Sequence, residues 1–285
     1  MQYAAPKSVQ DAVELLAGEA GVARVLAGGT DVLVQMKMGM IEPDLLLDIK
    51  NIVGLKDITA EAGGFRIGAA VSGAELGEHV GVSTLWPGVV EAVELIGSTQ
   101  VQGRATMAGN LCNASPAGDS VPAMAAAGAV ARIAGPEGIR DCLVADIPTA
   151  PGRTSLGNGE FITSIFLPER PDNASDAYLR FIPRTEMDIA VASAAVSLEF
   201  DAGGKCSAAK VVLGAVGPTI LNVDTDCLLG TTLDDAALEA LAAACSATAT
   251  PIDDKRGTAE FRKDVVGVLA KRAAKIAQTR AGVTS

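Results

Sequence analysis

The chain has 285 residues, of which 49% are hydrophobic, 20% charged and 3% aromatic, and its formal net charge is -11. This length and composition are typical of a globular protein with two or three domains and exclude a disordered chain. The negative charge and the scarcity of aromatic side chains argue against nucleic acid or an anionic membrane as a partner.

The first fifty residues alternate between helical and strand patterns. Ser8 is placed to cap the first helix, and the Gly28-Gly29 pair ends the first apolar strand. The expected elements are a helix at Val9–Leu16, a strand at Ala23–Ala27, a helix at Val32–Met38 and a strand at Asp44–Ile49. This order predicts a small α/β unit.

The middle of the chain mixes hairpin and helical patterns around one irregular stretch. Ile52–Ala70 reads as a hairpin that turns at Gly63-Gly64. Ser98–Asp119 keeps no regular period, and we expect a long ordered loop there. The other expected elements are helices at Ser72–His79, Pro87–Ile96 and Val121–Ala127 and strands at Ala129–Ile133, Arg140–Val144 and Glu160–Leu167.

The last part of the chain follows a linker expected at Pro168–Asp176. Beyond it the pattern predicts an antiparallel meander followed by helices, with strands at Ala177–Ile182, Val191–Phe200 and Lys205–Ala215 and helices at Asp234–Ala247 and Thr258–Ala281. We therefore expect three domains, at residues 1–55, 56–172 and 173–285. No apolar stretch is long enough to span a membrane, and the N-terminus does not resemble a signal peptide.

The reactive residues of the chain exclude several kinds of catalytic site. His79 is the only histidine, so neither a Ser/His or Cys/His pair nor a multi-histidine metal site can be assembled. The five cysteines include no CxxC pair and are expected to be reduced, which favours a cytoplasmic location. GxxxxGK[ST] and GxGxxG motifs are also absent. We expect no catalytic or metal-binding residue in this chain.

Two glycine-containing segments remain as candidate ligand sites. Leu26–Asp31 (LAGGTD) joins a strand to a helix, where free N–H groups and the positive end of a helix dipole can bind a phosphate. Thr106–Asp119 (TMAGNLCNASPAGD) combines a glycine with hydroxyl, amide and carboxylate groups that suit a dinucleotide. An ordinary turn with a helix cap, or a long structural loop, would also explain either segment alone.

Taken together, these segments resemble a known family. AGGTDV near residue 30, TMAGN and ASPAGDS about eighty residues later, and MDIAVASAAVSL and RGTAEFRKDVVGVLAKRA nearer the C-terminus are similar to the FAD-binding medium subunit of molybdenum hydroxylases of the carbon monoxide dehydrogenase and xanthine dehydrogenase type. The resemblance covers nearly the whole chain. It implies an α+β fold, with a two-subdomain FAD-binding α/β unit of the vanillyl-alcohol-oxidase-like type and a C-terminal antiparallel sheet with helices.

The resemblance also implies how FAD is held. The first loop, Val25–Val32, would wrap the pyrophosphate. The second segment would hold the pyrophosphate, ribityl and sugar groups, and two isoleucines would supply apolar contacts. Arg180 would lie near the isoalloxazine, where a cation stabilises the reduced flavin. The implied contacts are Val25, Leu26, Ala27, Gly28, Gly29, Thr30, Asp31, Val32, Ile96, Thr106, Ala108, Gly109, Asn110, Asp119, Ile162 and Arg180.

Two positions depart from the family's pattern. Ala108 stands where the second segment of relatives commonly has the first glycine of TxGGN, and Ile189 stands where some relatives have a tyrosine that covers the flavin. Both departures concern the surroundings of the flavin.

By the same resemblance, the chain would relay electrons within a complex. A large subunit would carry the molybdenum cofactor and a small subunit the iron–sulfur clusters, in a dimer of heterotrimers, and FAD would pass the electrons to an external acceptor. Two alternatives stay open: a self-sufficient FAD-dependent oxidoreductase acting on a small molecule, and a scaffold without enzymatic function. The sequence names neither the substrate nor the acceptor.

Overall fold

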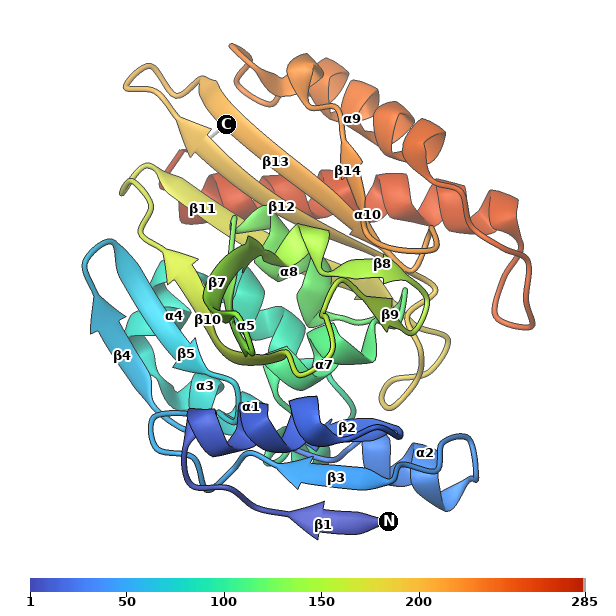
Figure 1. Ribbon diagram of the computed structural model, residues 1–285. Coiled ribbons are helices and arrows are strands. Elements are labelled where there is room, and N and C mark those ends of the chain that lie inside the picture. The colour runs from blue at the N-terminus through green and yellow to red at the C-terminus, as the bar shows by residue number, and fades with distance from the viewer. Residues whose placement is uncertain (284–285) are drawn as a thin grey trace.

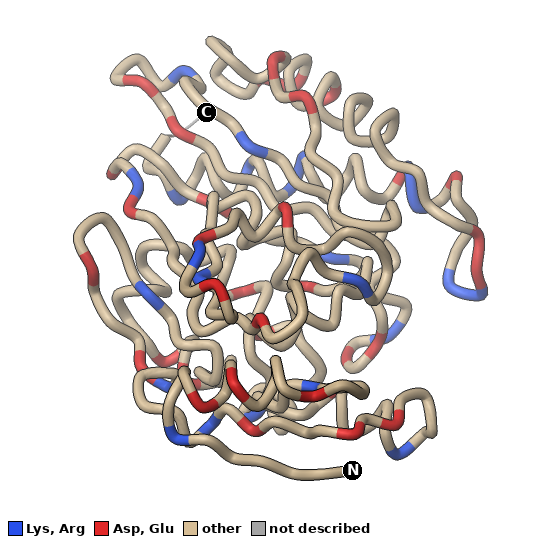
Figure 2. The backbone as a smooth tube through the Cα atoms, viewed as in Figure 1, with Lys and Arg blue, Asp and Glu red and all other residues tan. Residues whose placement is uncertain are grey.

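The computed structural model describes residues 1–283, which form three main β-sheets, each covered by helices, and a small two-stranded sheet at residues 148–154 (Figure 1). The expected domain boundaries, after residues 55 and 172, fall between these sheets. The division into independently folding domains stays a prediction. Lys and Arg positions are scattered among Asp and Glu along all three units (Figure 2).

The first unit is a parallel three-stranded sheet in the order β1-β3-β2. The Ser8 hydroxyl caps α1 by accepting a hydrogen bond from the Asp11 N–H, and α1 buries Ala12, Val13 and Leu16. The elements are β1 (Gln2–Ala4), α1 (Val9–Gly18), β2 (Ala23–Leu26), α2 (Val32–Lys37) and β3 (Leu45–Asp48). The predicted α/β unit is confirmed, with β1 as an addition.

The second unit is an antiparallel sheet in the order β4-β5-β10-β6-β7, together with a run of helices. The predicted hairpin around Gly63-Gly64 is present as β4 and β5. The elements are β4 (Ile58–Glu61), β5 (Gly64–Gly68), α3 (Gly73–Glu78), α4 (Val80–Leu85), α5 (Pro87–Glu94), α6 (Thr99–Gln102), α7 (Met107–Asn113), α8 (Ser120–Ala126), β6 (Val130–Gly135), β7 (Gly138–Leu143), β8 (Pro148–Ala150), β9 (Arg153–Thr154) and β10 (Phe161–Pro168), with a 3-10 turn at Val144–Asp146.

The third unit is an antiparallel meander in the order β11-β12-β13-β14. α10 packs on β11 and β12, and α9 packs on α10 (Figure 1). The elements are β11 (Ala174–Phe181), β12 (Ala192–Phe200), β13 (Cys206–Gly214), β14 (Leu221–Val223), α9 (Asp235–Thr248) and α10 (Ala259–Arg280), with a 3-10 turn at Asp226–Leu228. The predicted linker is shorter than expected, because β11 already begins at Ala174.

The units are joined through small, buried helices of the second unit. α8 lies between the second and third units and contacts β12 and β13, and every residue of α8 is buried. α5 contacts β11, and Arg280 at the end of α10 reaches back to the Glu91 carboxylate of α5 at 3.1 Å. None of the helices in residues 1–283 combines the length and apolarity that a membrane crossing requires.

Candidate functional site

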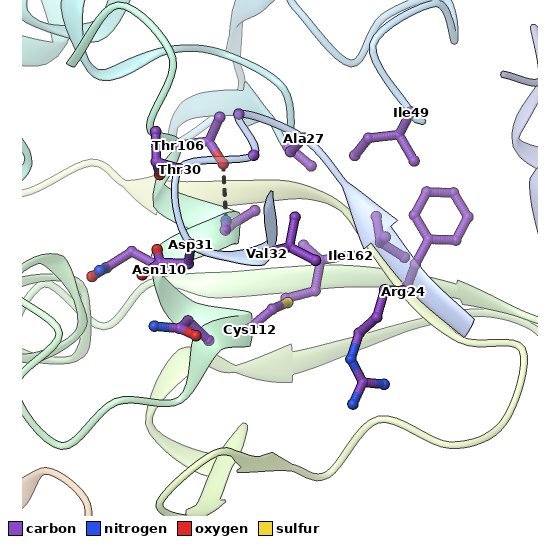
Figure 3. Close-up of a pocket in the computed structure, with 18 of the residues that line it drawn as sticks. Arg24, Ala27, Thr30, Asp31, Val32, Ile49, Thr106, Asn110, Cys112 and Ile162 are labelled. Carbon is purple, nitrogen blue, oxygen red and sulfur yellow. Dashed lines mark hydrogen bonds between the residues drawn. The ribbon is translucent and has the colours of Figure 1, made fainter. Parts of the chain in front are cut away.

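A cavity of about 510 Å³ lies where β2 and α2 of the first unit face α7 and β10 of the second (Figure 3). This volume is typical of sites for small molecules and cofactors. Of the residues expected to contact a dinucleotide, those that line the cavity are Val25, Ala27, Gly28, Gly29, Thr30, Asp31, Val32, Ile96, Thr106, Ala108, Gly109, Asn110 and Ile162.

The loop after β2 presents a run of free backbone donors to this cavity. Within residues 1–283, the N–H groups of residues 28 to 32 donate to no backbone or side-chain acceptor. Gly29 has φ +80°, a conformation that favours glycine. A Cβ on Gly28 would lie 1.9 Å from the Arg104 carbonyl oxygen, so only glycine fits there. The loop therefore offers consecutive N–H groups of the kind that bind a pyrophosphate.

Two short helices occupy half of Ser98–Asp119, which corrects the expectation of one long loop there. α6 and α7 lie within this segment, and α7 spans Met107–Asn113. The Thr106 oxygen accepts a hydrogen bond from the Gly109 N–H at 2.9 Å and so caps α7 (Figure 3). Gly109 keeps this cap open, because a Cβ there would lie 2.9 Å from the same oxygen.

Asn110 places an amide at the edge of the cavity. Its Oδ1 accepts hydrogen bonds from the Ser120 N–H at 3.2 Å and the Ser120 hydroxyl at 2.8 Å, which fixes the side chain against the start of α8. In the described part of the chain, the Asn110 Nδ2 donates to no acceptor. Asn110 is thus a fixed donor for a ligand oxygen.

Gln35 and Asn113 connect the two walls of the cavity. The Gln35 Nε2 donates to the Asn113 Oδ1 at 3.0 Å, and both residues line the cavity. Sequence reasoning missed this pair, together with Cys112 and Arg24. Cys112 and Asn113 lie three and four residues after Gly109, so the helical period would have placed them on the same face once α7 was recognised.

Comparison with known proteins identifies the architecture. The family described as the FAD binding domain in molybdopterin dehydrogenase matches residues 1–170, and the family described as the CO dehydrogenase flavoprotein C-terminal domain matches residues 177–277. The chain belongs to this family of FAD-binding subunits. Its fold is therefore that of a molybdenum-hydroxylase flavin subunit.

Individual relatives match the chain over almost its full length. It is 34% identical to the carbon monoxide dehydrogenase medium chain of Afipia carboxidovorans, covering 98% of this chain and 97% of the relative. It is 29% identical to a putative xanthine dehydrogenase FAD-binding subunit of Escherichia coli, with the same coverage of both chains. The solved structure of reconstituted CO dehydrogenase from Oligotropha carboxidovorans superimposes with a TM-score of 0.94 at 34% identity, covering 98% of each chain.

Three residues of the expected FAD set do not line the cavity of this flavin subunit: Leu26, Asp119 and Arg180. Leu26 is the buried last residue of β2. Asp119 is held by Arg180 Nη1 at 2.6 Å and by the Tyr178 hydroxyl at 2.9 Å. Asp119 immediately precedes Ser120, the partner of Asn110, so the ion pair lies directly behind the cavity wall. Each carboxylate oxygen of Asp119 can accept a further hydrogen bond, so its expected contact with a sugar hydroxyl stays a prediction.

Burial dominates the electrostatics of this ion pair. The side chains of Asp119 and Arg180 are 10% and 6% exposed. Desolvation raises the pKa of Asp119 to about 6, although the Arg180 charge and the hydrogen bonds from Tyr178 and Arg180 oppose the shift. The Nε of Arg180 is buried and has no acceptor in the described residues. The pair therefore holds one unused donor, the Arg180 Nε.

The two departures from the family's pattern have different structural settings. Ala108 lies in the first turn of α7 and is buried, and its φ is not positive, so alanine causes no backbone strain. Ile189 is 52% exposed and does not line the cavity.

His79 accepts a hydrogen bond from the Val82 N–H and caps α4. Within residues 1–283, no group of three His, Cys, Asp or Glu side chains is placed to hold a metal ion.

Proposed function

We propose that FAD occupies the cavity between α2 and α7, and that the chain relays electrons from iron–sulfur clusters on a partner subunit to an external acceptor. The observation that carries the proposal is the run of free N–H groups at residues 28 to 32, which faces a cavity of cofactor size. Membership of the family identifies the dinucleotide as FAD. Bound FAD supplies one-electron and two-electron redox chemistry.

Different groups of the chain would contact different parts of the cofactor. Free N–H groups at residues 28 to 32 would hold the pyrophosphate, and the Asn110 amide would donate to a neighbouring oxygen. Ile96 and Ile162 would pack against apolar parts of the ligand. Together with the close approach at Gly28, these groups fit a dinucleotide stretched along the cavity.

Arg180 and Asp119 would act on the flavin from behind the wall. Because the Arg180 guanidinium is buried and one of its donors is unused, it would favour a flavin that gains negative charge on reduction. Asp119 would fix the orientation of the guanidinium through its 2.6 Å ion pair. This assignment extends the expected role of Arg180 to a buried pair.

A relay role agrees with the titratable groups that line the cavity. Asp31, Glu160, Arg24 and Cys112 lie there, and the Arg140 side chain holds the Glu160 carboxylate through two hydrogen bonds of 2.7 Å. The cavity thus lacks a paired nucleophile and base among the described residues. The chain would assemble with a molybdenum subunit and an iron–sulfur subunit into a dimer of heterotrimers, as expected from the resemblance. A cytoplasmic location is also part of it.

One experiment distinguishes FAD binding by this chain from electron relay through it. The chain is purified alone and with its partner subunits, and flavin, iron and molybdenum are measured per protomer. Rapid-mixing absorbance then follows the reduction of FAD after addition of an oxidisable substrate of the complex. FAD should be reduced only in the complex, after the iron–sulfur clusters. Reduction of the isolated chain by an organic substrate would favour the self-sufficient oxidoreductase, and a colourless chain that takes up no FAD would favour the scaffold.

A further inference from the structure

Three polar side chains meet at one edge of the first sheet, behind the loop that follows β2. Asp48 is the last residue of β3, and one of its carboxylate oxygens accepts a hydrogen bond from the Tyr3 hydroxyl of β1 at 2.7 Å. The Lys50 ammonium lies 2.8 Å from the other oxygen. We call Tyr3, Asp48 and Lys50 the Asp48 cluster. Since the strands of this sheet are parallel, their carboxyl ends lie together at the edge where ligands of α/β sheets bind.

Lys50 also contacts the backbone of the glycine loop. Its Nζ donates to the Ala27 carbonyl oxygen at 3.1 Å, and among residues 1–283 no other donor reaches that oxygen. Ala27 and Ile49 lie beside each other in the cavity wall, whereas Lys50 does not line the cavity (Figure 3). The Ala27 carbonyl belongs to the same peptide group as the Gly28 N–H. The contact with Lys50 therefore fixes the orientation of that N–H.

The geometry of the peptide group decides where this N–H points. A planar trans peptide directs its carbonyl oxygen and its N–H to opposite sides, and every peptide bond within residues 1–283 is trans. With the Ala27 oxygen turned toward Lys50, the Gly28 N–H points away from the Asp48 cluster, and Gly28 lines the cavity. Rotation of this one peptide would present a carbonyl oxygen to a bound anion in place of a donor.

We propose that Lys50 is a positioning residue for the pyrophosphate, an inference that rests on the proposed binding of FAD. Lys50 holds the peptide between Ala27 and Gly28 in the orientation that suits phosphate oxygens, and Asp48 and Tyr3 hold Lys50 in place. A hydrogen bond from an ammonium to the carbonyl oxygen also polarises the peptide, which strengthens its N–H as a donor. No side chain of the Asp48 cluster lines the cavity, so the effect passes through the backbone.

Burial and charge favour this role over that of an ordinary surface ion pair. The side chains of Asp48 and Lys50 are 8% and 25% exposed, so water screens the pair less than an exposed pair. Although desolvation opposes the shift, the hydrogen bonds from Lys50 and Tyr3 and the Lys50 charge lower the pKa of Asp48 below its usual value. The ionised carboxylate neutralises Lys50. The Asp48 cluster therefore contributes orientation rather than a net positive charge.

Three lysine variants test the positioning role. Lys50→Met removes the ammonium, while Asp48 keeps its hydrogen bonds from the Tyr3 hydroxyl and from the backbone N–H of residue 50. Lys56→Met is the matched control, because Lys56 is exposed and forms no ion pair among the described residues. Lys50→Arg tests rescue, since a guanidinium can donate to both the Asp48 carboxylate and the Ala27 oxygen. Each variant is purified with its partner subunits, freed of FAD and titrated with FAD.

The expected results separate positioning from a merely structural role. A freed peptide must be ordered again on binding, so Lys50→Met should raise the Kd for FAD about 5-fold to 30-fold. The Tm of the flavin-free protein should stay unchanged, and Lys50→Arg should restore most of the affinity. Phosphorus NMR of bound FAD should show shifted pyrophosphate resonances in Lys50→Met and unchanged ones in Lys56→Met.

Three outcomes would overturn the positioning role of Lys50. They are an unchanged Kd in Lys50→Met, pyrophosphate resonances identical to those of the wild type, and a loss of affinity that accompanies a lower Tm and that arginine does not rescue. A wild-type complex that takes up no FAD would contradict the proposed function instead.

Discussion

Replacing Gly28 by alanine tests the pyrophosphate loop at the point where the backbone is most crowded. A Cβ there would lie 1.9 Å from the Arg104 carbonyl oxygen and 3.1 Å from the Ala105 nitrogen, and neither backbone atom can move alone. Overpacking of this kind lowers the free energy of unfolding by about 1–3 kcal/mol. Relief of the clash moves residues 28 to 32 away from their positions in the cavity wall.

The cost to FAD binding follows from the donors that move. One hydrogen bond to a charged group contributes about 1.5–3 kcal/mol. Loss of one such bond to the pyrophosphate therefore raises the Kd for FAD by about 10-fold to 150-fold. Quenching of flavin fluorescence on titration of the flavin-free protein measures this Kd, and circular dichroism measures the change in Tm.

Gly18→Ala is the matched control for Gly28→Ala. Gly18 ends α1, its φ is not positive, and a Cβ there would meet no atom within 4 Å. This variant should bind FAD as the wild type does and be as stable or slightly more so, because alanine favours a helix. If Gly28→Ala binds FAD within about twofold of the wild type at an unchanged Tm, the loop does not hold the pyrophosphate as proposed.

Further predictions concern the walls of the cavity and the ion pairs around it. Gln35→Ala removes the 3.0 Å bond to Asn113, so FAD should dissociate several-fold faster in stopped-flow fluorescence; an unchanged rate would exclude a closing role for this bond. Because burial raises the pKa of Asp119 to about 6, the native flavin-free chain holds a proton that the unfolded chain has released. The free energy of unfolding should therefore fall by up to about 3 kcal/mol between pH 4 and pH 6, and urea titrations of Asp119→Asn should lack this component. Arg170→Ala leaves the Asp176 carboxylate buried without its 2.8 Å partner, which should destabilise the chain by about 3–5 kcal/mol in urea unfolding, whereas Arg170→Lys should lose less.

The sequence predicted those helices and strands in which apolar residues repeat at a regular spacing. Strand β12 and helix α10 begin within a residue of their expected positions, because apolar residues repeat along each at the strand or helical spacing. Strands β1 and β14 were not predicted. Each has three residues, too few to show a period, and forms by pairing with a longer strand, β1 with the distant β3 and β14 with the preceding strand β13. Local propensity carries no information about such pairings.

The candidate site was predicted only in part, because local patterns again show only local features. Gly28 and Gly29 could be predicted as part of the site because a glycine pair at the end of an apolar strand is a local signal. α7 was taken for a loop because Gly, Asn and Cys have weak helical propensity, yet burial of Met107 and Leu111 at i, i+4 spacing stabilises it. The Thr106 cap and that spacing were the available signals.

The ion pair between Asp119 and Arg180 could not be seen from the sequence. The two residues are 61 positions apart, and β11 brings them together only when the third unit packs behind the cavity. A prediction of the role of each residue by itself therefore missed that the two charges neutralise each other.

The contact made by Arg280 sets an order in which parts of the chain can assemble. Arg280 donates to the Asp176 carbonyl oxygen at 3.0 Å and to Glu91 in the second unit, 189 positions earlier in the chain. The segments that line the cavity are synthesised well before this arginine. The first two units can therefore collapse during translation before α10 has been made, and their docking to α10 is a later step.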